Sequence, residues 1–185
     1  MTIIRQGDPQ WADAAVGIGT QKFSAVGCLV CCIQQAALDL VDGATTPDPR
    51  IANMRGRDAG AFVGSGAIIE KLAAANQMRC GPRIDGDVVM LRAVIIAALI
   101  NGQKVLLHVD HDSTLPKGDP EADHFILARS YVTPSLADDT GQVICADPAT
   151  GKEVRLLTAT LKGPSGWRDG RPYEVKGLRV LSRLH

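Results

Sequence analysis

The sequence has few aromatic residues and no excess of charge of either sign. Phe, Trp and Tyr make up 4% of its 185 residues, and 20 Lys and Arg balance 20 Asp and Glu, which gives a formal net charge of zero. Nucleic acids and anionic membranes normally bind surfaces with a basic excess, so we expect neither kind of partner. Hydrophobic residues still make up 45% of the chain, which excludes general disorder.

Long apolar runs and a secretory leader are also missing. The most hydrophobic stretch, 88–100, contains Arg92 and is shorter than the roughly 20 apolar residues that span a bilayer. It therefore predicts a buried helix. The N-terminus lacks the apolar segment and the small-residue cleavage site of a signal peptide, so we expect synthesis in the cytoplasm. The length favours one domain, residues 1–185.

Cysteine usage argues against a disulfide-stapled fold. The five cysteines are an odd, unevenly spaced set: Cys28, Cys31, Cys32, Cys80 and Cys145. Such a set fits a reducing compartment better than a secreted framework. Cys28 and Cys31 form a CxxC motif, but a zinc site needs a second ligand pair, and the sequence contains no other CxxC and no HxxxH, while His108 and His111 have no cysteines near them. No metal or organic cofactor is implied, and a redox disulfide between Cys28 and Cys31 stays open as an alternative.

The order of predicted elements is helices first and strands second. Apolar spacing and N-caps at Asp48, Ser65 and Asp87 predict helices over 28–40, 49–54, 65–76 and 88–100. Short β-rich runs predict strands over 104–110, 124–131, 142–146, 153–157 and 174–181. A strand stub at 3–4, a long loop up to residue 27 and a loop over 163–172 complete the prediction. This is the α+β pattern, with helices beside an antiparallel sheet.

Cys28 is the strongest candidate for a nucleophile. It follows Gly27 and begins a helix, where the first-turn N–H groups and the positive end of the helix dipole favour a thiolate. The alternative is simple packing, because cysteine is among the most buried residue types. Packing is what we expect for Cys31, Cys32 and Cys145.

The candidate base is His124, which begins an apolar strand directly after a polar loop. At that position its ring can project near solvent at an edge of the sheet. His108, inside another predicted strand, is the second choice. We expect His111, in a loop, and His185, at the terminus, to be solvated.

Asp147 is the candidate for orienting the histidine ring. Its ordinary role would be to begin a turn with Pro148. Antiparallel pairing, however, places the beginning of the strand at His124 opposite the end of the following strand at Asp147. A carboxylate there can accept a hydrogen bond from the imidazole, as a nucleophile–base pair requires.

Around these residues the sequence resembles the C39-like peptidases of bacteria and bacteriophages, a branch of the papain-like cysteine protease superfamily. Three ordered blocks carry the resemblance: Gln6 to Trp11 with Ser24 to Cys28, then 105–110 with 124–128, then 143–148 with Gly151. Residues 49–66 are similar to the helical insert between nucleophile and base. Together the blocks cover most of the chain.

The resemblance implies a papain-like α+β fold, with an N-terminal helical half packed on a C-terminal antiparallel β-sheet. It implies a cysteine hydrolase in which Cys28 is the nucleophile, His124 the general base and acid, and Asp147 the residue that orients the imidazole. It also implies that Gln6 donates a hydrogen bond to the oxyanion, with Gln21 as the alternative donor.

The implied substrate is a peptide, a protein, an isopeptide or the peptide of peptidoglycan. A phage or secretion assembly is the implied association, and the implied destinations are a virion or the cell wall. The run 29–32, Leu-Val-Cys-Cys, replaces the small or hydroxylated residues common in the family. A non-catalytic structural or binding protein is therefore the alternative function.

Overall fold

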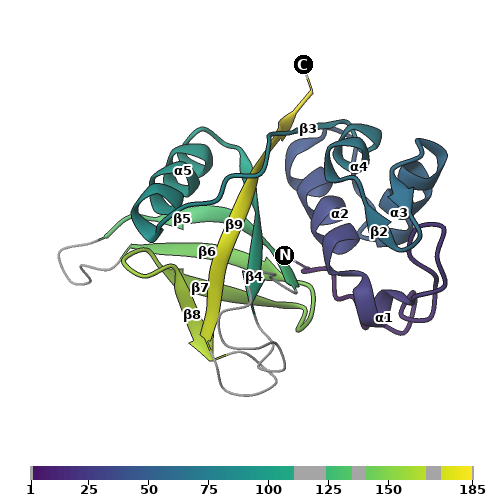
Figure 1. Ribbon diagram of the computed structural model, residues 1–185, viewed down its shortest axis with the longest axis horizontal. Helices are drawn as coiled ribbons and strands as arrows, with labels where there is room; N and C mark the ends of the chain where they lie inside the picture. The colour runs from purple at the N-terminus through teal and green to yellow at the C-terminus, as the bar shows by residue number, and fades with distance from the viewer. Residues whose placement is uncertain (1, 111–123, 135–140, 166–171, 185) are drawn as a thin grey trace.

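The computed structural model describes residues 2–110, 124–134, 141–165 and 172–184. Four helices gather on one side of the molecule, and a barrel of strands with the fifth helix forms the other side (Figure 1). The helices are α1 (Phe23–Val26), α2 (Cys28–Leu40), α3 (Pro49–Asp58), α4 (Ile69–Ala75) and α5 (Val88–Ile100). In the described ranges, no helix has both the length and the hydropathy that crossing a membrane requires.

Six antiparallel strands close into a barrel in the order β9, β4, β5, β6, β7, β8, with β8 pairing back onto β9. Their bounds are β4 (Lys104–Asp110), β5 (His124–Val132), β6 (Gln142–Asp147), β7 (Lys152–Leu157), β8 (Lys162–Ser165) and β9 (Pro172–Arg183). The short strand β3 (Met78–Cys80) pairs with the far end of β9. A separate hairpin joins β1 (Phe62–Val63) to β2 (Gly66–Ala67).

The predicted papain-like fold, a helical half packed on an antiparallel sheet, is wrong. The sheet closes on itself as a barrel because β8 bridges β7 and β9. This four-residue strand overlaps the segment 163–172, whose glycines and prolines predicted a loop. A strand this short has no readable alternation, so the sequence did not reveal the closure.

Most other boundaries follow local signals. The helices predicted over 28–40 and 88–100 are confirmed, and the carboxylate of Asp87 accepts a hydrogen bond from the Met90 N–H at 2.8 Å. Gly102, with φ of +74°, follows the end of α5, as a left-handed C-terminal residue should. The helix at 49–54 continues to Asp58.

Three local predictions differ from the structure. Ser65 does not cap a helix, because it lies in the turn between β1 and β2, and α4 begins only at Ile69. No strand forms at 3–4, and the loop that follows contains α1. The strand β3 was not predicted, because three residues leave no detectable period.

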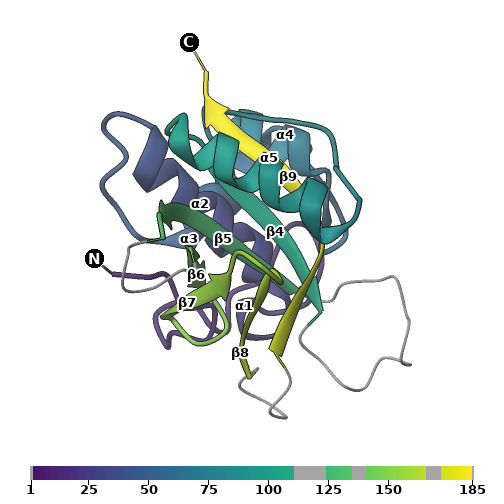
Figure 2. The same cartoon turned by 90° about the vertical axis from the view of Figure 1, so that its left-hand side faces the viewer.

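Alternation along the barrel strands separates two apolar clusters. On β5, Ile126 and Ala128 belong to the cluster inside the barrel, whereas Leu127 belongs to the cluster shared with the helices. Apolar side chains of α5 join the inner cluster, and this helix lies against β4, β5 and β9 (Figure 2). The barrel therefore has a filled interior.

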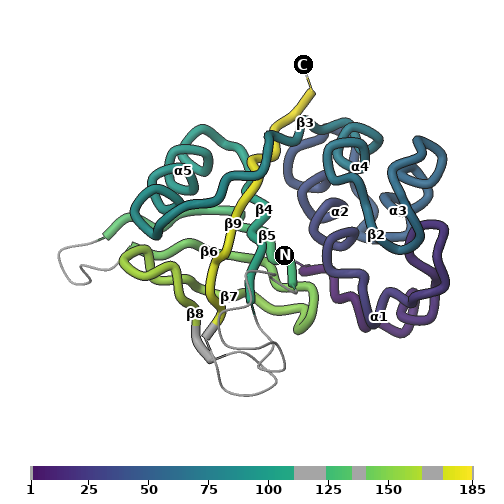
Figure 3. Tube along the Cα trace, in the orientation of Figure 1, coloured from purple at the N-terminus to yellow at the C-terminus, as the bar shows by residue number. Residues whose placement is uncertain are grey.

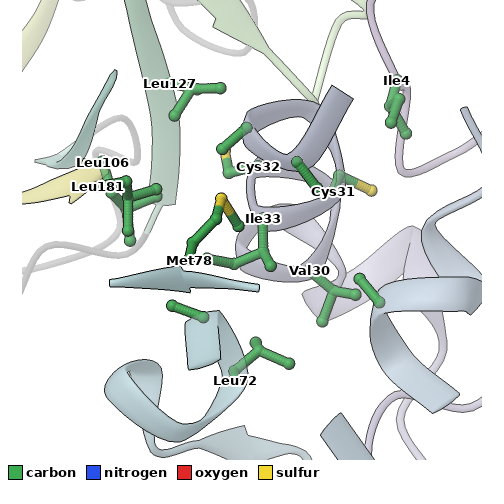
Figure 4. Close-up of a cluster of buried hydrophobic side chains, with 14 of the residues drawn as sticks. Ile4, Val30, Cys31, Cys32, Ile33, Leu72, Met78, Leu106, Leu127 and Leu181 are labelled. Carbon is green, nitrogen blue, oxygen red and sulfur yellow. The ribbon is translucent and has the colours of Figure 1, made fainter. Parts of the chain in front are cut away.

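The helices pack on the outside of the barrel mainly through α2, which lies against β5. Ile33 and Cys32 of α2 meet Leu127 and Met78 in this contact (Figure 4). The start of the chain lies between the barrel and the helices (Figure 3), where the backbone N–H of Gln6 donates to the carbonyl of Pro148 at 2.8 Å. This packing fixes the N-terminus of α2 relative to β5 and β6.

Candidate active site

Cys28 is the first residue of α2, and its side chain is half-buried. The first turn of a helix has N–H groups without intrahelical partners and carries the positive end of the dipole. Both favour the ionised form of a thiol at this position.

Residue 27 has to be a glycine because Phe23 of α1 leaves no room for a side chain at this position. A Cβ atom at Gly27 would lie 2.6 Å from the carbonyl oxygen of Phe23 and 2.7 Å from its Cδ1. The backbone of Gly27 is right-handed, with φ of −77°, so the constraint is steric and not conformational. The absence of a side chain lets α1 and α2 follow each other directly, which brings Cys28 to the junction with the barrel.

His124 and Asp147 lie side by side where β5 begins and β6 ends. Their side chains are 3% and 0% exposed, and Nε2 of His124 lies 2.8 Å from Oδ1 of Asp147. The antiparallel register, in which Leu127 faces Ala146, places the start of one strand near the end of the other. Strand alternation puts both side chains on the face that lines the barrel.

The Asp147 carboxylate is fully engaged in hydrogen bonds. Besides His124, its Oδ1 accepts from the Ala149 N–H at 2.9 Å. Its Oδ2 accepts from the Thr150 hydroxyl at 2.8 Å and from the Tyr173 hydroxyl at 2.9 Å. A buried charge needs such partners, and these donors allow Asp147 to stay ionised beside the imidazole.

Cys28 and His124 shift each other's protonation. Burial by itself raises the pKa of the Cys28 thiol, but hydrogen bonding to His124 and its charge outweigh burial, and the pKa lies below its ordinary value. Burial lowers the pKa of His124, but hydrogen bonds to Asp147 and Cys28 outweigh it and raise the pKa to about 9. Both shifts favour a thiolate beside an imidazolium.

Asp147 completes the electrostatics of the pair. Burial by itself raises the pKa of its carboxyl. The hydrogen bond to His124 and the charge of the histidine outweigh burial, so the pKa of Asp147 lies below its ordinary value. By contrast, burial raises the pKa of Cys31, Cys32 and Cys145. Cys28 therefore differs from these three thiols in being placed to ionise.

Gln6 lies between the segments that carry Cys28 and Asp147. Its side-chain Nε2 donates to the carbonyl of Ser24 at 3.2 Å, four residues before Cys28. Its Oε1 is buried and has no hydrogen-bond partner among the described residues. Gln21 is exposed, and its backbone carbonyl accepts from the Val16 N–H. The structure thus places the side chain of Gln6 against the backbone that leads into α2 and leaves that of Gln21 exposed.

Of the histidines that the structure describes, His108 does not join this group. His108 lies on β4 and stacks its ring on Phe125, with ring centroids 4.5 Å apart. Along β4 it alternates with the residues that line the barrel interior, which places it on the opposite face from His124. His111 and His185 lie outside the described residues.

Sequence reasoning missed two contributors to the site, Thr150 and Tyr173. Thr150 had a local signal, because a hydroxyl three residues after an Asp-Pro turn can reach back to the aspartate. Tyr173 had none, since it comes from β9, 26 residues beyond Asp147 in the chain. Only closure of the barrel brings it to the carboxylate.

The described part of the chain contains no cluster of three or more His, Cys, Asp or Glu side chains arranged to hold a metal ion. No family model matches the sequence, and no curated protein matches it. The resemblance to C39-like peptidases therefore stays a prediction that rests on its three motif blocks.

Proposed function

We propose that the protein is a cysteine hydrolase that cleaves a peptide or related amide bond through a thioester on Cys28. The observation that supports this most directly is the buried hydrogen bond of His124 to Asp147 beside a Cys28 thiol of lowered pKa. Structural cysteines normally show the opposite shift, as Cys31 and Cys32 do. A low-pKa thiol coupled to an oriented imidazole is the arrangement that nucleophilic catalysis needs.

In the first half of the reaction, the Cys28 thiolate attacks the acyl carbon and forms a carbon–sulfur bond. The electron pair of the carbonyl moves onto its oxygen, which the Cys28 backbone N–H and the Gln6 side chain stabilise. When the oxyanion collapses, the carbon–nitrogen bond breaks and the His124 imidazolium donates its proton to the leaving amine.

In the second half, water hydrolyses the thioester. The now neutral His124 accepts a proton from the attacking water, and the new tetrahedral oxyanion uses the same two donors. Collapse breaks the carbon–sulfur bond, releases a carboxylic acid and restores the thiolate and the imidazolium. Asp147 keeps the imidazole in one orientation and stabilises its charge during both halves.

The substrate classes we propose are a peptide, a protein, an isopeptide or the peptide of peptidoglycan, and they rest on the motif resemblance. A phage or secretion assembly that delivers the enzyme to a cell wall is the setting proposed with them. The hydrolase proposal itself depends on Cys28, His124 and Asp147 alone.

The experiment is site-resolved iodoacetamide labelling, read by mass spectrometry from about pH 5 to about pH 9. Cys28 of the wild type should label selectively at the acidic end, and His124→Ala should abolish this acid reactivity. His108→Ala, a histidine on the other face of the barrel wall, is the matched control and should label like the wild type. Peptide and muropeptide substrates can then be screened, with Cys28→Ala as the blank.

An ordinary thiol titration of Cys28, unchanged in His124→Ala, would overturn the hydrolase assignment. The non-catalytic structural or binding protein would then be the better description of the chain.

A further inference from the structure

Tyr173 provides a fourth side chain to the Cys28–His124–Asp147 group. Its hydroxyl donates to Oδ2 of Asp147 at 2.9 Å, and its side chain is buried. Its ring is tilted by 32° to the His124 ring, with centroids 6.1 Å apart. The tyrosine therefore bonds the carboxylate oxygen that His124 does not.

The two oxygens of Asp147 have different partners. Oδ1 accepts from His124 and from the Ala149 backbone, whereas Oδ2 accepts from the hydroxyls of Thr150 and Tyr173. Ala149 and Thr150 belong to the turn that Asp147 itself begins. Tyr173 comes from a different strand, so it is the donor that ties the carboxylate to the closed barrel.

We propose that Tyr173 is a positioning residue of this site, which fixes the Asp147 carboxylate against His124 and limits the negative charge that the imidazole meets. The inference rests on the proposed function, because it assigns a role within the same site. It adds a hydroxyl donor that acts on the reaction through Asp147.

The physical reason is charge sharing within a buried network. Each donor to a carboxylate draws negative charge toward itself, and in a low-dielectric interior this polarisation is transmitted along the network. When the Tyr173 hydroxyl is removed, Oδ2 keeps the Thr150 hydroxyl as its donor among the described residues, and more negative charge faces the imidazolium. The imidazolium then holds its proton more tightly.

Other ionisable groups surround His124 and need to be kept constant in any test. Among the described residues of the elements packed around it, they include Cys28, Cys31 and Cys32 of α2, His108 and Asp110 of β4, Cys145 and Asp147 of β6, and Glu174 of β9. Tyr173→Phe changes none of them. It also keeps the aromatic ring, so packing inside the barrel is preserved.

The test is an NMR titration of the His124 ring in the wild type and in Tyr173→Phe, with the signal assigned by its loss in His124→Ala. We expect the His124 pKa to rise by about half a unit in Tyr173→Phe, as for loss of one hydrogen bond in a buried network. Tyr131→Phe is the matched control, because Tyr131 packs against the same inner cluster and should leave the titration unchanged.

Thr150→Val removes the other hydroxyl donor from Oδ2 and should shift the pKa in the same direction. An unchanged or lowered His124 pKa in Tyr173→Phe overturns the inference, even where thermal stability falls. The iodoacetamide experiment judges the hydrolase separately. If Cys28 shows no acid reactivity, the His124 ring can still be titrated in the wild type and in Tyr173→Phe. Failure of the hydrolase proposal and failure of the Tyr173 inference are therefore distinguishable.

Discussion

Nε2 of His124 and Oδ1 of Asp147 lie 2.8 Å apart at the adjoining ends of β5 and β6, and both side chains are buried. Asp147 is hydrogen-bonded to one ring nitrogen of His124, so the other ring nitrogen is available to Cys28. The hydrogen bond between His124 and Cys28 lowers the pKa of the thiol. The pair thus determines which nitrogen can exchange a proton with the nucleophile.

Asp147→Asn should weaken the thiolate–imidazolium pair. An amide cannot supply the negative charge that stabilises the imidazolium, so the His124 pKa should fall from about 9 toward its ordinary value. Amide hydrolysis should drop about 100-fold or more, the scale of a misdirected general acid–base residue. Asp85→Asn, at an exposed ion pair with Arg83, is the control. NMR titration and labelling of Cys28 at acidic pH measure the effect, and wild-type values in Asp147→Asn would contradict it.

The pH dependence of hydrolysis should be bell-shaped. As pH rises through the lowered pKa of Cys28, the thiol loses its proton and activity appears at a pH below that of an ordinary cysteine. As pH rises through about 9, His124 loses its proton and can no longer protonate the leaving amine, so activity falls. Initial rates across this range measure both limbs. An activity that still rises beyond pH 9 would show that His124 is not the proton donor.

Gln6→Glu should remove a donor from the oxyanion while keeping the size of the side chain. Loss of one such donor costs about 10²- to 10³-fold in turnover. Labelling of Cys28 by iodoacetamide forms no oxyanion, so it should fall less than turnover does, although the added carboxylate opposes ionisation of the thiol. Gln21→Glu is the matched control, since Gln21 is exposed. If Gln21→Glu were the variant that lost turnover, the donor assignment would have to be exchanged.

Gly27→Ala should displace the start of α2. The new Cβ would overlap the Phe23 carbonyl at 2.6 Å, and overpacking of this kind costs about 1–3 kcal/mol of stability. The acid reactivity of Cys28 should fall with it, because the cysteine follows the displaced residue. Gly7→Ala is the control, since its Cβ would meet nothing closer than 3.9 Å. Denaturant unfolding and labelling measure the two effects, and a fully reactive Gly27→Ala protein would refute the steric account.

Cys31→Ala should leave the reactivity of Cys28 intact. Cys31 is 1% exposed and burial raises its pKa, so it makes a poor thiolate. Under mild oxidant, mass spectrometry should detect no reversible Cys28–Cys31 disulfide, and Cys80→Ala should behave the same way. A disulfide that forms in the wild type and disappears only in Cys31→Ala would favour the redox alternative.

Short-range features of this protein could be predicted from the sequence because their causes are local. The bounds of α2 and α5 follow from apolar spacing and from residues such as Asp87 and Gly102, which act on their own helix ends. The candidates Cys28, His124 and Asp147 could be chosen because each stands at the end of a recognisable element. Their proximity was expected from one hairpin, whose ends meet whenever its strands pair.

The tertiary structure alone decided the closure of the sheet and the surroundings of the candidate site. Barrel closure depends on β8, a strand of four residues that is too short to show alternation and that joins β7 to β9. The same closure brings the hydroxyl of Tyr173 to the carboxylate of Asp147, 26 residues earlier in the chain. Local sequence carries no record of such contacts, because they exist only after segments far apart in the chain have packed together.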